Sequence, residues 1–229
     1  MNYPNIFSYA TSELSQDAFI CWILSWAAPE YEKSDDGLYK CANKFISIFF
    51  KKHGICMPSK VEKIEIRKQA NYIDVLCILN SKYAIVIEDK IRTKNRLNQL
   101  KKNIESAKEL GYEKQNIIPI YYKTEDQSNY LDIYKDGYQT LLREEIVSVL
   151  SEYSGNNAIL LDYREHLQSI TYKVESYKDK KISDWDRYSW IGFYRELQAQ
   201  LGDGDWSYVS NPAGGFLGFW WFRQESDEC

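Results

Sequence analysis

The sequence contains no apolar run near the ~20 residues that a membrane-spanning helix requires. Residues 1–16 also lack the basic start and the apolar stretch of a secretory signal peptide. We therefore expect a cytoplasmic protein that has no membrane partner.

Histidines and paired cysteines are scarce. Two histidines, His53 and His166, are too few for a histidine-based metal site, and neither lies near a recognisable motif. The five cysteines are scattered, odd in number and never spaced as Cys-x-x-Cys. This spacing matches no zinc site and favours reduced thiols.

Motifs of two common hydrolase classes are missing as well. The chain has neither the phosphate-binding loop of nucleotide hydrolases nor the Gly-x-Ser-x-Gly turn of serine hydrolases. Its net charge of −4 argues against a protein that coats nucleic acid through bulk charge. One segment nevertheless carries only basic charges, which predicts either a solvated helix face or a surface that approaches phosphate: Lys90, Arg92, Lys94, Arg96, Lys101 and Lys102.

What the chain does contain is a pattern of helices followed by strands. Its 229 residues, of which 44% are hydrophobic, suffice for a sizeable core. The spacing of apolar residues predicts a helix over residues 13–28, capped by Thr11 or Ser12, and a second helix between Asp35 and His53.

The spacing then changes to that of strands. Residues 61–68 alternate apolar and charged side chains, whereas residues 72–79 and 83–87 are apolar runs that suit strands covered on both faces. A helix over residues 94–110 and a strand over residues 116–122 follow. This order predicts an α/β protein with an α/β/α core, in which a mixed sheet lies between helical layers.

The remainder of the chain is expected to form an extension on that core. Its elements are helices over residues 140–153, 157–176 and 185–201, and strands over residues 206–209 and 216–223. We expect residues 1–125 to form the core, and residues 126–229 to form a helical extension with an aromatic β-hairpin packed on it. Because the chain ends directly after a strand-like run, it is expected to be a piece of a longer protein.

The two apolar runs have a register that can be worked out from their loop. If residues 80–82 form a three-residue loop, Leu79 pairs with Tyr83, and Asp74 then lies directly opposite Glu88. Directly opposed residues point to the same face, with Cβ atoms ~5 Å apart. The two carboxylates are therefore predicted to be neighbours.

The period of two along a strand places Lys90 on the same face as Glu88 and turns Asp89 to the other face. Opposed carboxylates destabilise a hairpin unless they share a proton or bind a cation. Hard divalent ions such as Mg²⁺ or Mn²⁺ take oxygen ligands and keep several waters, so Asp74, Glu88 and a backbone carbonyl would suffice. Lys90 beside such an ion could orient an attacking water or stabilise charge on a phosphate.

These residues resemble a known family. The segments Ile73-Asp74-Val75-Leu76 and Ala84-Ile85-Val86-Ile87-Glu88-Asp89-Lys90 are similar to the PD-(D/E)XK nuclease superfamily, and more closely to a bacterial branch of uncharacterised proteins with an Ile-Asp…Ile-Glu-Asp-Lys pattern. The resemblance covers residues 5–122. It implies a restriction-endonuclease-like core and hydrolysis of phosphodiester bonds with Mg or Mn, in DNA in preference to RNA.

The resemblance also implies a role for each residue. Asp74 and Glu88 would be metal ligands, Lys90 the catalytic lysine, and Glu13 and Gln99 supporting catalytic residues. Loss of Lys90 is predicted to abolish cleavage and to leave the fold nearly unchanged.

Two segments depart from the family pattern. Lys101-Lys102-Asn103 follows the Gln-Leu pair, where a Tyr or His is common, and the first strand reads Arg67-Lys68-Gln69, where an acidic residue is frequent. These departures concern the surroundings of the site and leave the Asp, Glu and Lys trio intact.

Other functions are compatible with parts of the pattern. A nuclease fold that has lost catalysis could bind nucleic acid or a protein partner, and the acidic net charge favours this alternative. Glycoside hydrolysis by paired carboxylates fits poorly, because a lysine between strands has no part in it. The aromatic residues of the last third are expected in a core in preference to stacking on bases, and a homodimer is compatible with the sequence.

Overall fold

The computed structural model describes residues 4–92, 98–212 and 214–221. The chain divides into two compact units, one of Met1–Glu125 with Leu131–Leu167 and the other of Asp126–Tyr130 with Gln168–Cys229. This division differs from the expected boundary at residue 125, because β5 (Gln139–Leu142) continues the sheet of the first unit.

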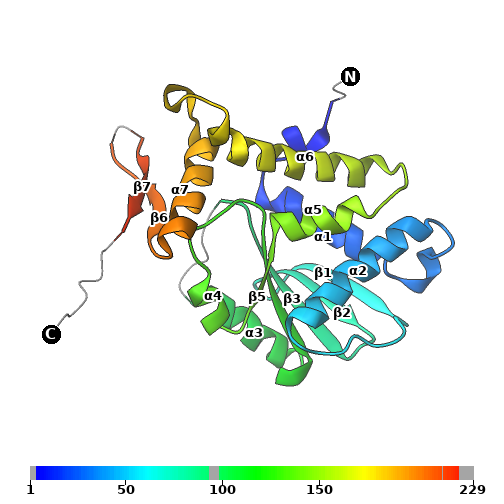
Figure 1. Ribbon diagram of the computed structural model, residues 1–229. Coiled ribbons are helices and arrows are strands. Elements are labelled where there is room, and N and C mark those ends of the chain that lie inside the picture. Colours follow the sequence, from blue (N-terminus) through cyan, green and yellow to red (C-terminus); the bar gives the residue numbers. More distant parts are fainter. Residues whose placement is uncertain (1–3, 93–97, 213, 222–229) are drawn as a thin grey trace. The chain divides into compact units, whose positions relative to one another are not determined.

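Five strands of the first unit form one mixed sheet in the order β1-β2-β3-β4-β5. They are β1 (Ile64–Ala70), β2 (Ile73–Leu79), β3 (Tyr83–Lys90), β4 (Ile117–Lys123) and β5. Strands β1, β2 and β3 are antiparallel, whereas β4 and β5 run parallel to β3. The predicted α/β class with a mixed sheet between helices is confirmed (Figure 1).

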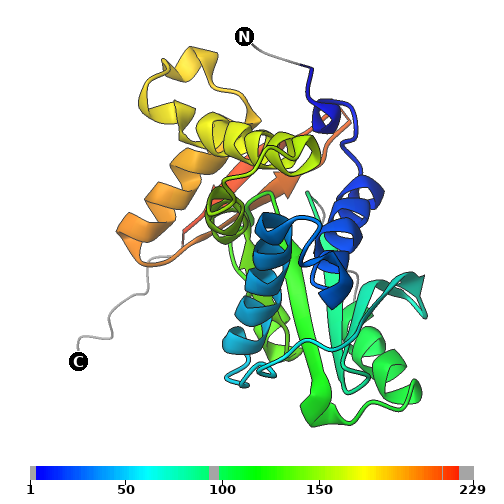
Figure 2. The same ribbon diagram turned by 90° about the vertical axis from the view of Figure 1, so that its right-hand side faces the viewer.

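Helices cover both faces of this sheet. Alternate residues of β3 point to opposite faces, and Tyr83 meets Phe50 of α2 (Asp36–Lys52), while Asp89 meets Gln16 of α1 (Glu13–Ser25). Glu88 instead meets α3 (Gln99–Glu109). Helices α1 and α2 therefore share one face, where Figure 2 shows them side by side, and α3 lies on the other.

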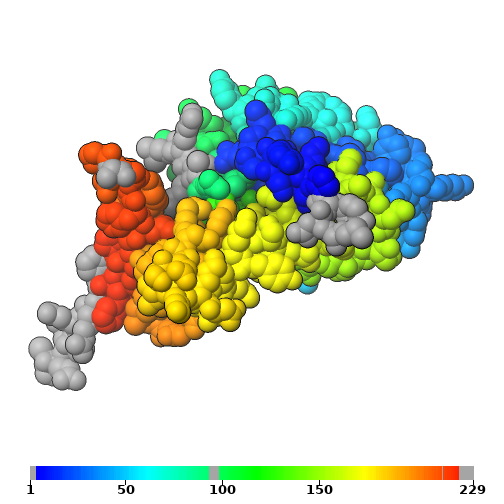
Figure 3. All heavy atoms as spheres, turned by 90° about the horizontal axis from the view of Figure 1, so that it is seen from above, coloured from blue at the N-terminus to red at the C-terminus, as the bar shows by residue number. Residues whose placement is uncertain are grey.

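The chain contains further helices and 3-10 turns besides these elements. They are helices α4 (Leu131–Lys135), α5 (Arg143–Ser151) and α6 (Ala158–Glu175), and 3-10 turns at Ile6–Ser8, Pro29–Tyr31, Lys114–Asn116, Ser176–Lys178 and Ile182–Asp184. Within the first unit, Tyr163 of α6 stacks on Phe19 of α1 with ring centroids 3.7 Å apart. Figure 3 shows the α1 region, in blue, at the surface beside the cyan strands.

Local side chains explain where several elements begin and turn. Ser12 caps α1 by accepting the Ser15 N–H, as predicted, and Asp35 caps α2 by accepting the Leu38 N–H. In the loop between β2 and β3, Asn80 and Ser81 have φ of 52° and 55°. Asparagine tolerates this left-handed region better than most residues, which favours the tight turn.

One expected helix begins later than predicted, and two other expected elements extend beyond the described residues. The helix predicted from residue 140 begins at Arg143, because residues 139–142 pair with the parallel strand β4. A strand of four residues is too short to show the alternation of apolar and polar residues by which a strand is recognised in the sequence. The helix predicted over residues 94–110 is α3, and residues 94–97 lie outside the described residues, as do residues 222–223 of the last predicted strand.

The second unit contains the aromatic hairpin. Helix α7 (Arg187–Leu201) is followed by the antiparallel strands β6 (Asp205–Val209) and β7 (Phe216–Trp220). The hairpin is attached to α7 by Tyr194, whose hydroxyl donates to the Leu217 carbonyl at 3.3 Å. In the part of the chain that the structure describes, no helix has the length and apolar character to cross a membrane.

Candidate functional site

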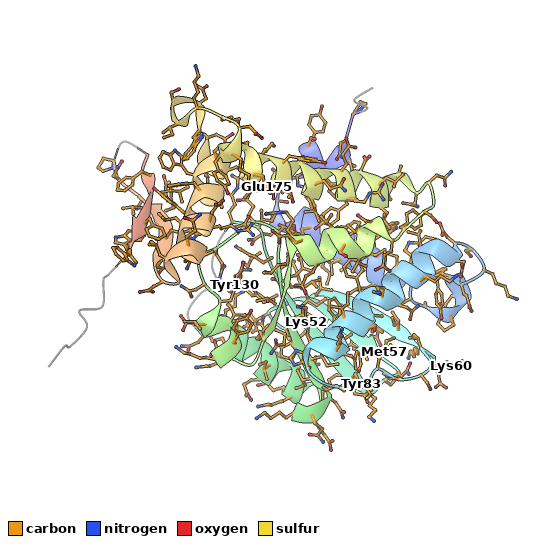
Figure 4. The ribbon with its side chains drawn as sticks, viewed as in Figure 1. Lys52, Met57, Lys60, Tyr83, Tyr130 and Glu175 are labelled. Atoms are coloured by element: carbon orange, nitrogen blue, oxygen red, sulfur yellow. The ribbon has the colours of Figure 1, made fainter. Side chains whose placement is uncertain are left out.

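The predicted register of the β2–β3 hairpin is confirmed. Leu79 pairs with Tyr83, and the ladder continues to Val75 opposite Ile87, so Asp74 and Glu88 are the next residues outward. Tyr83, labelled in Figure 4, marks the start of β3, and Lys90 ends the same strand. Both carboxylates therefore lie at the open end of the hairpin, with Lys90 beside them.

Lys90 is the centre of a cluster of charged groups. Its ammonium lies 2.5 Å from Glu88 Oε1, 3.5 Å from Asp74 Oδ2 and 3.8 Å from Glu13 Oε2, and it donates to the Asp89 carbonyl oxygen at 2.8 Å. The Lys90 side chain is 9% exposed and that of Glu88 is fully buried, whereas those of Asp74 and Glu13 are 24% and 38% exposed. The cluster is thus buried on one side and accessible on the other.

Helix α3 holds the inner carboxylate of this cluster. Gln99 donates to Glu88 Oε1 at 2.6 Å, and Asn103 donates to Glu88 Oε2 at 2.7 Å. The two amides lie four residues apart and therefore on one helix face. Both oxygens of Glu88 thus accept side-chain hydrogen bonds, which fix the orientation of the carboxylate.

The outer carboxylates are held by backbone groups. Asp74 Oδ2 accepts the N–H of Asp89 at 2.9 Å, and Glu13 Oε1 accepts the N–H of Ile91 at 3.2 Å. The ladder between β1 and β2 omits the pair of Gln69 with Asp74, and Gln69 has a φ of 49°. This interruption leaves the Asp74 carboxylate turned toward β3.

Asp89 faces the α1 layer, as the period of two predicts. Its Oδ1 accepts a hydrogen bond from the amide of Gln16, whose own oxygen accepts from the Thr124 hydroxyl at 2.9 Å. Asp17 lies on the same helix and is also buried. Asp89 therefore meets an amide and a second acid on that face.

The structure brings all five predicted site residues together: Asp74, Glu88, Lys90, Glu13 and Gln99. Sequence reasoning missed the contact of Asn103 with Glu88 and the contact of Gln16 with Asp89. The spacing of Asn103 four residues after Gln99 is the signal that could have found it.

The predicted basic run divides into different environments. Lys90 belongs to the cluster, Arg92 pairs with Glu125 at 2.9 Å, and Lys101 pairs with Asp136 at 3.4 Å. Lys94 and Arg96 lie outside the described residues. The described part of the run is therefore not one continuous basic helix face.

Burial raises the pKa of the inner carboxyl groups. For Glu88 the pKa rises to about 7, with the Asp74 charge adding to the burial effect and Lys90 opposing it. The pKa of Asp89 is raised well above its usual range by burial, in spite of the Gln16 hydrogen bond. Burial alone would lower the pKa of Lys90, but Glu88 and Asp74 outweigh it, so the net pKa is raised and Lys90 stays protonated.

The raised pKa of Glu88 predicts a stability that falls as pH rises. Between its ordinary pKa of 4.5 and its raised pKa of about 7, the folded protein holds a proton that the unfolded chain has released. The free energy of unfolding, measured with urea in the presence of EDTA, should therefore be about 2 kcal/mol lower at pH 8 than at pH 5 because of this group. Glu88→Gln should abolish this part of the pH dependence of stability. A variant whose stability depends on pH as in the wild type would contradict the raised pKa of Glu88.

The donor atoms of the cluster suit a hard cation. No set of three or more His, Cys, Asp or Glu side chains within the described residues is arranged to hold a metal ion. In the cluster, the carboxylates of Asp74 and Glu88 and the backbone carbonyl of Asp89 surround one position. The Lys90 ammonium occupies that position. Ions such as Mg²⁺ keep several waters and need only one or two carboxylates, so this donor set fits them.

Comparison of the chain with family models, with curated proteins and with solved structures found no match. The resemblance to the PD-(D/E)XK superfamily therefore stays a prediction that rests on the residues quoted for it.

Proposed function

We propose that the protein is a metal-dependent nuclease that hydrolyses phosphodiester bonds in DNA, in the manner of the PD-(D/E)XK superfamily. One observation carries this proposal: three oxygens, from Glu88, Asp74 and the Asp89 backbone, converge on the Lys90 ammonium at the end of a two-stranded hairpin. A salt bridge that only stabilises the fold needs one carboxylate per lysine. The three oxygens match the three N–H donors of the ammonium, but its single positive charge balances only one of the two carboxylates.

In this proposal Asp74 and Glu88 hold Mg²⁺ or Mn²⁺, which when bound lowers the pKa of a coordinated water and neutralises phosphate charge. Gln99 and Asn103 keep the Glu88 carboxylate in one orientation through their hydrogen bonds. Lys90 donates protons in hydrogen bonds from the buried side of the cluster, so it can orient a water and stabilise negative charge on the phosphate. Glu13 lies on the solvent-accessible side of the cluster, 3.8 Å from the Lys90 ammonium.

The alternative is a nuclease fold without catalysis that binds nucleic acid or a protein partner. The observation that favours it is the Lys90 ammonium itself, which lies 2.5 Å from Glu88 and 3.5 Å from Asp74 and balances one of the two carboxylate charges without a metal ion. Binding of a divalent ion must therefore compete with this ammonium, and a direct measurement of metal binding separates the two functions.

Asp74→Asn tests the proposed function in two measurements, binding of the metal ion and cleavage of DNA. We expect the wild-type protein to bind Mn²⁺ in calorimetry and to nick plasmid DNA in Mn²⁺ but not in EDTA. The variant should lose the binding heat and lower the nicking rate at least about 10²-fold, because one of two charged ligands is gone.

Asp132→Asn is the matched control, since the Asp132 side chain is 86% exposed and belongs to the same unit. It should leave both readouts unchanged. A wild-type protein that shows no Mn²⁺ heat dependent on Asp74, and no cleavage of single- or double-stranded DNA or RNA, would support the non-catalytic alternative.

A further inference from the structure

The second unit contains a cavity of about 510 Å³ with mainly aromatic walls. One wall is a single face of α7, formed by Arg187, Trp190 and Tyr194 at positions three and four residues apart. The opposite wall is the β6–β7 hairpin, including Tyr208 and Phe216. Figure 1 shows α7 beside this hairpin.

The two walls are held in place by hydrogen bonds within the unit. Besides the bond from Tyr194 to the hairpin backbone, Gln198 of α7 donates to the Gly204 carbonyl at 2.8 Å and accepts from the Trp206 indole at 3.2 Å. These hydrogen bonds hold α7 and the hairpin, which form the two walls, next to each other.

A glycine shapes the hairpin wall. Gly215 has a φ of 102°, and a Cβ there would lie 2.6 Å from the Tyr208 hydroxyl. Only glycine permits this backbone conformation and this close approach together. The Tyr208 ring thereby lies beside the cavity; residue Tyr208 is 55% exposed and residue Phe216 is 57% exposed.

The chemistry of the lining selects one class of ligand. The flat aromatic rings of Trp190, Tyr208 and Phe216 offer stacking surfaces, and Arg187 supplies a positive charge. Among the described residues that line the cavity there is no carboxylate. A planar ring attached to an anion matches both properties. A volume of this size lies within the ~300–1,000 Å³ usual for small-ligand sites.

We propose that this cavity binds a nucleotide of a single-stranded nucleic acid, with its base against the aromatic walls and its phosphate toward Arg187. The choice of nucleic acid rests on the proposed function of the first unit. A base within a duplex is stacked between its neighbours and must leave the duplex to enter this cavity, so we expect the protein to prefer single strands.

Binding in EDTA tests this assignment without cleavage. Fluorescence anisotropy of a labelled oligothymidylate should show a dissociation constant raised about tenfold by Phe216→Ala, since one stacking contact is lost. Arg187→Gln should weaken binding and lower its dependence on salt concentration. Ultraviolet cross-linking of the oligonucleotide should place the adduct on Trp190 or Tyr208.

Tyr172→Ala is the matched control, because Tyr172 is an aromatic residue of the second unit, 75% exposed, and does not line the cavity. It should change the dissociation constant less than about twofold. Unchanged affinity of Phe216→Ala, equal affinity for a duplex of the same length, or saturable binding of a proline-rich peptide that depends on Phe216 would each overturn the assignment.

The two proposals fail in different ways. A protein that cleaves no substrate but binds the oligonucleotide with the expected dependence on Phe216 loses the nuclease function and keeps the cavity assignment. A protein that cleaves DNA, while Phe216→Ala leaves binding unchanged, loses only the cavity assignment.

Discussion

Lys90→Ala is expected to lower the rate of metal-dependent cleavage by about 10²- to 10³-fold, the range found when one positioned donor that stabilises developing negative charge is lost. The ammonium of Lys90 lies 2.5 Å from Glu88, 3.5 Å from Asp74 and 3.8 Å from Glu13. Its removal deprives the site of the group that orients water and stabilises phosphate charge. The rate of plasmid nicking in Mn²⁺ measures the loss.

The same substitution should also reduce stability, which differs from the sequence-based expectation of a nearly unchanged fold. Lys90 is buried among three acids, and removal of one partner from a buried ion pair costs about 3–5 kcal/mol. Protonation of Glu88, with its pKa of about 7, offsets part of this cost below neutral pH. Urea unfolding at pH 6 and pH 8 should therefore show the larger loss at pH 8.

Activity and folding must be separated in that experiment. Lys90→Met keeps most of the side-chain volume, so it should lose cleavage to a similar extent while it remains folded at pH 6. Lys40→Ala, at a side chain 73% exposed in the same unit, should change neither readout. Cleavage by a folded Lys90→Met protein at the wild-type rate would refute the role of Lys90.

Asn103→Asp is expected to be strongly destabilising although it is a conservative change. Asn103 is fully buried and donates its amide hydrogen to Glu88 at 2.7 Å. An aspartate there replaces a donor by an acceptor and places a second carboxylate against the first. We expect a loss of about 3 kcal/mol or more at pH 8, and a smaller loss at pH 5, where the pair can hold a proton.

The control for this substitution is Asn43→Asp, which makes the same chemical change at a half-buried asparagine of α2. It should cost less than about 1 kcal/mol at both pH values. Urea unfolding measures both variants. Equal losses in the two, or a loss at position 103 that does not vary with pH, would show that Asn103 does not hold Glu88.

Part of the fold followed from local patterns. The tight loop after Leu79 determined the register of β2 and β3, and the period of two then separated Glu88 from Asp89. Local patterns did not predict β5, because residues 139–142 become a strand only through pairing with β4. A four-residue segment carries too little periodicity to indicate a strand without its partner.

The candidate site shows the same division. The sequence alone determined that Asp74, Glu88 and Lys90 share one end of a hairpin, since a short loop and strand alternation are local constraints. Only the tertiary structure placed Asn103 and Gln16 on opposite faces of β3, and it decided that Lys90 is buried. Those contacts depend on how helices outside the hairpin pack on the two faces of the sheet, and burial is a property of that packing.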